Sequence, residues 1–193
     1  MGTSGRLGAL GLFGGTFDPI HWGHLLLAES ARDALGLAQL QFVPARVPPH
    51  KQDRGITPTT HRLAMLELAI AGNPGFGLCR WELDQSGPSY TVDTLRHMTA
   101  EGWGPIYLLI GGDSLAQLPT WREPEVIRQL ATLVVFDRPG WQPDVDGVLT
   151  LALPQIDVSS TAVRERLKTG RTIRYWVPET VRQYIGDQGL YRD

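Results

Sequence analysis

The sequence predicts an α/β domain, built on an open parallel sheet with helices on both faces. Short apolar runs alternate with segments of helical periodicity along most of the 193 residues, which is the pattern of β-α-β units. One run, Ile106–Ile110, is apolar throughout, as expected of a strand buried on both faces. The length suits one domain with a substantial core and is short for two. We therefore expect a flexible leader over residues 1–8 and a single domain over residues 9–193.

The first half of the chain predicts three strands, each followed by a helix. The expected strands cover residues 9–13, 39–43 and 76–81, and the expected helices cover residues 22–35, 58–71 and 89–102. Gly36 is placed to end the first helix, and Thr57 and Pro58 have the residue types of an N-cap and a first helical position. We expect the second helix to bury Leu63, Leu66, Ala69 and Ile70. Residues 44–55 are proline-rich, basic and aperiodic, and so predict a long loop. We expect residues 48–55 of this loop to be its mobile segment.

The second half continues the alternation and closes with two helices. We expect strands over residues 105–110, 132–136 and 148–153, a short helix after residue 114, and helices over residues 124–130, 159–168 and 178–185. Three expected strands end in glycine or polar turns with chemically useful side chains. Because ligands of open α/β sheets bind outside the carboxyl ends of the strands, these turns predict the site.

Composition narrows the range of partners. A net charge of −2 gives no general electrostatic reason to bind nucleic acid or an anionic membrane. No apolar run approaches the roughly 18–20 residues that span a bilayer. The one cysteine, Cys79, excludes an internal disulfide and fits a reducing, cytoplasmic setting. Any affinity for an anion must therefore come from a local site.

Such a site is predicted where the first strand ends. The apolar run stops at Gly14 and Gly15, and His21-Trp22-Gly23-His24 opens the following helix. A turn of this kind presents backbone N–H groups and the positive end of a helix dipole to an anion, which we interpret as a nucleotide phosphate chain. His21 and His24 share a helical face, where imidazolium groups would complement phosphate oxygens. Gly23 removes a side chain where a flat base could approach.

A second cluster of polar side chains lies at the start of the helix expected over residues 159–168. Ser159 has the residue type of an N-cap, Ser160 and Thr161 add hydroxyl groups, and Arg164 lies close enough to bend back toward a phosphate. Helix capping alone would explain the hydroxyl groups. The loop sequence Pro48-Pro49-His50-Lys51 adds two basic side chains.

These motifs resemble those of a known family. Gly15-Thr16-Phe17-Asp18-Pro19 followed by His21-Trp22-Gly23-His24 resembles the nucleotidyltransferase signature, and Ser159-Ser160-Thr161 with Arg164 resembles its Ser-Ser-Thr-x-x-Arg motif. Residues 89–95, Gly111-Gly112-Asp113-Ser114 and Trp121 resemble the bacterial nicotinate mononucleotide adenylyltransferases in particular. The resemblance extends from about residue 9 onward, and implies a Rossmann-like sheet of the nucleotidyltransferase type.

The resemblance also implies roles for individual residues. His21, His24 and Arg164 are implied as catalytic residues. ATP contacts are implied for Gly14, Gly15, Thr16, Phe17, Gly23, Asp113, Arg138, Ser159, Ser160 and Thr161. Phosphate binding is implied for His50 and Lys51, and mononucleotide binding for Tyr90, Thr91, Trp121 and Arg122.

The implied reaction is transfer of AMP from ATP to nicotinate mononucleotide, which gives nicotinate adenine dinucleotide and pyrophosphate in NAD biosynthesis. Mg²⁺ would arrive with ATP, and no protein metal site is expected. Nicotinamide mononucleotide and phosphopantetheine remain alternative acceptors, the second disfavoured because its enzymes usually carry Thr at the position of His21. A non-catalytic nucleotide-binding or sensor module is the alternative of another class, against which the two histidines, Lys51 and Arg164 argue. The sequence leaves homo-oligomer formation open.

Overall fold

The fold is known from a computed structural model, which describes residues 7–46, 55–85, 88–136, 145–152 and 156–192. Within these ranges the strands are β1 (Leu10–Gly15), β2 (Gln39–Pro44), β3 (Phe76–Leu78), β4 (Ile106–Ile110), β5 (Thr132–Phe136) and β6 (Val148–Leu151). The helices are α1 (Trp22–Ala34), α2 (Thr59–Ile70), α3 (Trp81–Asp84), α4 (Thr91–Ala100), α5 (Gly112–Gln117), α6 (Pro124–Leu130), α7 (Ser160–Lys168) and α8 (Glu179–Asp187), with a 3-10 turn, η1 (Leu118–Thr120). Most of the predicted leader lies outside the described residues.

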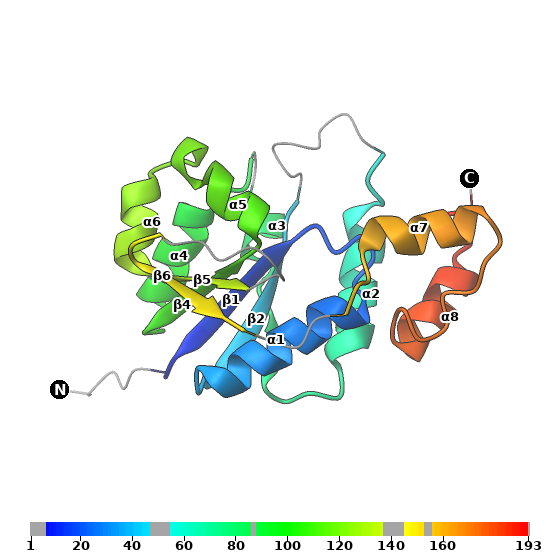
Figure 1. Ribbon diagram of the computed structural model, residues 1–193, viewed down its shortest axis with the longest axis horizontal. Helices are drawn as coiled ribbons and strands as arrows, with labels where there is room; N and C mark the ends of the chain where they lie inside the picture. The colour runs from blue at the N-terminus through cyan, green and yellow to red at the C-terminus, as the bar shows by residue number, and fades with distance from the viewer. Residues whose placement is uncertain (1–6, 47–54, 86–87, 137–144, 153–155, 193) are drawn as a thin grey trace.

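All the strands pair in parallel, in the order β3-β2-β1-β4-β5-β6. The chain builds outward from β1 through β2 to β3, and then returns to the other side of β1 to begin β4 (Figure 1). Phe13 accordingly pairs with Phe42 on one side and Leu109 on the other. This reversal of direction opens a crevice at the carboxyl ends of β1 and β4. The predicted fold class is confirmed.

Side chains alternate between two cores on the faces of the sheet. Leu10 and Leu12 of β1 join a core with buried residues of α4, α5 and α6. Phe13 joins the opposite core, which includes buried residues of α1, α2, α7 and α8. The strands are therefore covered on both faces, as the apolar Ile106–Ile110 run predicts. No helix in the described ranges combines the length and the apolar character that a bilayer crossing requires.

The predicted end of α1 is confirmed, whereas the predicted end of β3 and the predicted cap of α2 are wrong. Gly36 follows α1 with a φ of 59°, the left-handed conformation of a helix-ending glycine. The expected strand 76–81 stops at Leu78, because Trp81 begins the short helix α3. The predicted capping of α2 is wrong: Pro58 holds the N-cap position without a side-chain hydrogen bond. The backbone N–H of Thr57 instead donates to Asp18 Oδ2 at 3.3 Å.

The buried stripe of α2 also differs from the prediction. Arg62, Met65 and Leu66 are its buried residues, so only Leu66 of the expected set is fully buried. These three positions lie on one face of the helix. Arg62 occupies a position on that buried face where an apolar side chain is usual. Sequence periodicity alone treats such an arginine as a solvent-facing residue.

Asp18 ties the loop after β1 to distant parts of the chain. Its side chain is buried, and Oδ1 accepts a hydrogen bond from the Tyr191 hydroxyl at 2.7 Å. Its backbone carbonyl accepts a second bond from Arg164 Nη1 at 2.6 Å. Burial and the bond to Asp18 raise the pKa of Tyr191 above its usual value, so this hydroxyl stays protonated and donates. The last residues of the chain thus contribute to the shape of the first loop.

We predict that Tyr191→Phe lowers the free energy of unfolding by about 2 kcal/mol, because a buried carboxylate oxygen loses its donor. Urea denaturation measures the change. Tyr175→Phe is the matched control, since Tyr175 has the same φ of 64° but is 84% exposed. Equal stabilities of the two variants would contradict the role of the Asp18–Tyr191 bond.

Candidate functional site

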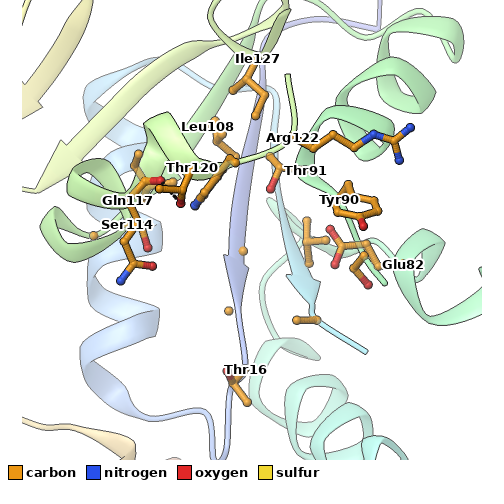
Figure 2. A pocket seen from close by; sticks show the side chains of 18 residues that line it. Thr16, Glu82, Tyr90, Thr91, Leu108, Ser114, Gln117, Thr120, Arg122 and Ile127 are labelled. Atoms are coloured by element: carbon orange, nitrogen blue, oxygen red, sulfur yellow. Dashed lines mark hydrogen bonds between the residues drawn. The ribbon is translucent and has the colours of Figure 1, made fainter. Parts of the chain in front are cut away.

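Two pockets adjoin at the carboxyl ends of β1 and β4. The larger, here called the histidine pocket, has a volume of about 900 Å³ and is lined by His21, Gly23, His24, Ser159 and Ser160, among others. The smaller, the tryptophan pocket, has a volume of about 330 Å³ and is lined by Trp121, among others. Figure 2 shows Thr91 and Tyr90 in its lining. Gly111 lines both pockets. One crevice therefore offers two neighbouring compartments.

The two histidines contact each other at the start of α1. His21 is the N-cap residue, and its Nδ1 accepts a hydrogen bond from the backbone N–H of His24 at 3.3 Å. The rings stack with centroids 3.6 Å apart and planes inclined by 23°. Because Nδ1 of His21 accepts, the proton of the neutral ring is assigned to Nε2. Nδ1 of His24 is buried without a partner among the described residues.

Burial keeps both rings uncharged in the ligand-free protein. It lowers the pKa of His21 to about 4. Burial also lowers the pKa of His24 well below its usual value, and repulsion from His21 lowers it further. The expectation of imidazolium groups therefore fails for the free protein at neutral pH, where the rings can only donate neutral N–H groups.

Gly23, Ser159 and Ser160 line the histidine pocket together with these rings. A Cβ atom at Gly23 would lie 3.1 Å from the His21 ring and 3.4 Å from the carbonyl oxygen of Val158, so glycine allows the start of α1 to approach the start of α7. Ser159 is the N-cap of α7, as predicted, and its Oγ accepts from the N–H of Ala162 at 3.2 Å. Ser160 Oγ donates to the carbonyl of Pro19 at 2.9 Å. The start of a second helix therefore borders the same pocket.

Four residues with implied roles do not line either pocket. Arg164 donates to Asp18 and, through Nη2, to Thr161 Oγ1 at 3.3 Å, so both side chains support the walls of the site. Phe17 packs in the core, its ring 5.1 Å from that of His24. Asp113 is exposed in the first turn of α5. An ATP contact by Phe17 would have to use its backbone, and the roles implied for these four residues remain predictions.

The tryptophan pocket brings together the other implied residues that the structure describes. Thr91 is the first residue of α4 and Tyr90 its N-cap, while Trp121 lies between η1 and α6. The Arg122 guanidinium lies 4.8 Å from the centre of the Tyr90 ring. Gly14, Gly15 and Thr16, implied as ATP ligands, line this pocket and not the histidine pocket. His50, Lys51 and Arg138 lie outside the described residues.

Glu82 is a pocket residue that reasoning from the sequence missed. Its side chain lines the tryptophan pocket (Figure 2) and accepts a hydrogen bond from Thr94 Oγ1 at 2.9 Å. Burial raises the pKa of this carboxyl group, and the bond from Thr94 opposes that rise. The signal was hidden because Glu82 directly follows a stretch that predicted a strand, whereas the chain there folds as α3.

Comparison with known proteins identifies the family of this chain independently of the site geometry. A model of the cytidylyltransferase-like family matches residues 12–166. The "Probable nicotinate-nucleotide adenylyltransferase" of Geobacillus thermodenitrificans is 46% identical over 187 residues, which cover 96% of this chain and 87% of that protein. A protein of the same name from Thermus thermophilus is 46% identical over 188 residues, covering 95% of this chain and 99% of that protein.

A solved structure shows the same fold at lower identity. Nicotinic acid mononucleotide adenylyltransferase of Plasmodium falciparum, complexed with NaAD, superposes with a TM-score of 0.78 and 19% identity. The match covers 95% of this chain and 97% of that one. At this identity the similarity extends to the fold alone.

We predict that the His21 ring of the free protein stays neutral until the pH approaches 4, which NMR titration of the ring resonances measures. An unfolded histidine has a pKa of about 6.5, so between these values the unfolded chain binds more protons than the folded one. The free energy of unfolding therefore falls as pH drops through this window. His21→Asn is expected to flatten that slope. A titration midpoint near 6.5 would contradict the burial of the ring.

Proposed function

Because the chain belongs to the nicotinate-nucleotide adenylyltransferases, within the cytidylyltransferase-like family, we propose that it transfers AMP from ATP to nicotinate mononucleotide. The products are nicotinate adenine dinucleotide and pyrophosphate. The observation that carries the proposal is the pair of pockets that share Gly111, because the reaction requires two nucleotides side by side.

We assign ATP to the histidine pocket. Its lining includes both His21, the N-cap of α1, and Ser159, the N-cap of α7. The positive ends of two helices therefore face one space of about 900 Å³, which favours a polyphosphate. His21 and His24 add ring N–H donors. A bound polyphosphate would raise the pKa values of both rings and could convert them to cations.

We assign the mononucleotide to the tryptophan pocket. Thr91 begins α4 there, so the helix end favours the carboxylate of the nicotinate ring. The indole of Trp121 offers an aromatic plate to the positively charged pyridinium ring. Carboxylate recognition by a helix end favours nicotinate over nicotinamide mononucleotide, the alternative acceptor.

The reaction needs no protein nucleophile. A phosphate oxygen of the mononucleotide attacks the α-phosphorus of ATP in line, a new P–O bond forms, and the bond to pyrophosphate breaks. The protein positions the two reactants and places donors where charge accumulates on the leaving pyrophosphate. His21 and His24 supply these donors. Arg164 would join them only by leaving its bonds to Asp18 and Thr161.

Mg²⁺ is proposed as a companion of ATP. Among the described residues that line the histidine pocket, Asp157 is the one acidic side chain, and one carboxylate suits an ion held mainly by phosphate oxygens and water. The ion would neutralise phosphate charge during transfer. The cytoplasm is the proposed location, because the single cysteine fits a reducing compartment.

Pyrophosphate release tests the proposal directly. The protein is incubated with ATP and Mg²⁺ together with nicotinate mononucleotide, nicotinamide mononucleotide or phosphopantetheine in turn. We expect the highest kcat/KM with nicotinate mononucleotide. A higher value with another acceptor would reassign the substrate, and no release with any of them would favour the nucleotide-binding module.

We predict that His21→Ala and His24→Ala each reduce kcat by about 10²–10³-fold, the usual cost of one lost donor to a transition state. The pyrophosphate assay measures the loss, and circular dichroism verifies that each variant is folded. His97→Ala is the control, because this ring stacks on Trp81 and lines neither pocket. Wild-type rates in both histidine variants would exclude the catalytic assignment.

We predict that Trp121→Ala raises KM for nicotinate mononucleotide about tenfold, because stacking on a cation contributes roughly 1 kcal/mol or more. KM for ATP should change little. Trp121→Phe keeps an aromatic plate and should retain most of the affinity. Equal losses for ATP and mononucleotide, measured by initial rates, would contradict the stacking role.

A further inference from the structure

Arg62 of α2 is the most deeply buried charged side chain among the described residues, with an exposed fraction of 1%. Nε donates to the Thr57 carbonyl at 3.0 Å, and Nη1 donates to the Thr16 carbonyl at 2.8 Å. Nη2 lies within hydrogen-bonding distance of the carbonyls of Ala45 (2.9 Å) and Arg46 (3.2 Å), and of Thr59 Oγ1 (2.9 Å). Every nitrogen of the guanidinium is therefore engaged, mostly by backbone carbonyls.

Two of the carbonyls that Arg62 binds, those of Thr16 and Ala45, lie where two neighbouring strands end. Thr16 directly follows β1 and Ala45 directly follows β2, and these strands pair up to Gly15 and Pro44. Both Thr16 and Ala45 line the tryptophan pocket. The guanidinium thus joins the backbone at Thr16 to the backbone at Ala45, without lining the pocket itself. It also holds both segments to the first turn of α2.

Stability alone gives a weak reason for a cation at this position. Taking a guanidinium out of water costs several kcal/mol, and a well-packed apolar side chain often stabilises a core as well or better. Burial lowers the pKa of Arg62, and the negative charge of Asp18 opposes that effect. None of the ion pairs in the described part of the chain includes Arg62. Its planar fork instead matches several carbonyls in one fixed arrangement, which a flexible lysine cannot reproduce.

We infer that Arg62 is a positioning residue for the transfer reaction: it sets the geometry of the mononucleotide pocket by holding the carbonyls of Thr16 and Ala45. This inference rests on the proposed function. Arg62 does not line either pocket, so it acts through the two walls it binds. In-line attack depends on alignment, and a displacement of about 1 Å can cost about 10²-fold in rate.

Arg62→Lys is the decisive variant, because it keeps the positive charge and loses the planar guanidinium that binds several carbonyls at once. We expect kcat to fall about 10- to 100-fold and KM for nicotinate mononucleotide to rise, with KM for ATP within about threefold of wild type. Thermal denaturation verifies that the variant is folded at the assay temperature. Arg32→Lys is the control, since Arg32 binds Glu29 and lines neither pocket, and its kinetics should match wild type.

A milder variant covers the case in which Arg62→Lys does not fold. Thr59→Val removes one acceptor of the guanidinium and should lower kcat a few-fold without changing KM for ATP. Wild-type kinetics in a folded Arg62→Lys protein, or in Thr59→Val where the lysine variant is unfolded, would overturn the inference. A loss of activity equal to the fraction of unfolded protein would overturn it as well. A wild-type protein that releases no pyrophosphate with nicotinate mononucleotide would instead overturn the proposed function.

Discussion

The shape of the loop between β1 and α1 depends on hydrogen-bond donors from distant parts of the chain. Its carbonyls at Thr16, Asp18 and Pro19 are bound by Arg62, Arg164 and Ser160, respectively. The Asp18 carboxylate binds the Tyr191 hydroxyl in addition. These donors come from α2, α7 and the last residues of the chain. The loop that leads to the histidines therefore acquires its shape only when the whole domain has folded.

In the proposed ATP site, the described residues of the free protein offer backbone dipoles to an anion more than ionised side chains. The histidine rings are neutral because they are buried, and Arg164 is occupied by Asp18 and Thr161. The starts of α1 and α7 remain directed at the histidine pocket. A chain with a net charge of −2 can attract a polyphosphate in this way, without a basic surface.

Features that depend on residues close together in the chain could be predicted from the sequence. Strand and helix positions follow from hydrophobic periodicity, and the Ser159 cap and the Gly36 helix end follow from residue types that favour those conformations. The burial of Arg62 and the Asp18–Tyr191 bond could not be predicted in the same way. Asp18 and Tyr191 are separated by 173 positions, and no local pattern records a contact at that distance. The neutral state of the histidines likewise depends on burial, which only the folded chain defines.

Gly111 lines both pockets, and the absence of a side chain at this position has a consequence for the boundary between them. Its φ of −77° and ψ of 162° suit any residue, and a Cβ atom there would meet no atom of the described residues beyond its two chain neighbours within 4 Å. Neither backbone strain nor packing therefore requires glycine at this position. A larger side chain at this position would add atoms at the boundary between the two proposed nucleotide sites. Residue 111 is therefore a position at which the boundary between the two proposed sites can vary while the described scaffold stays unchanged.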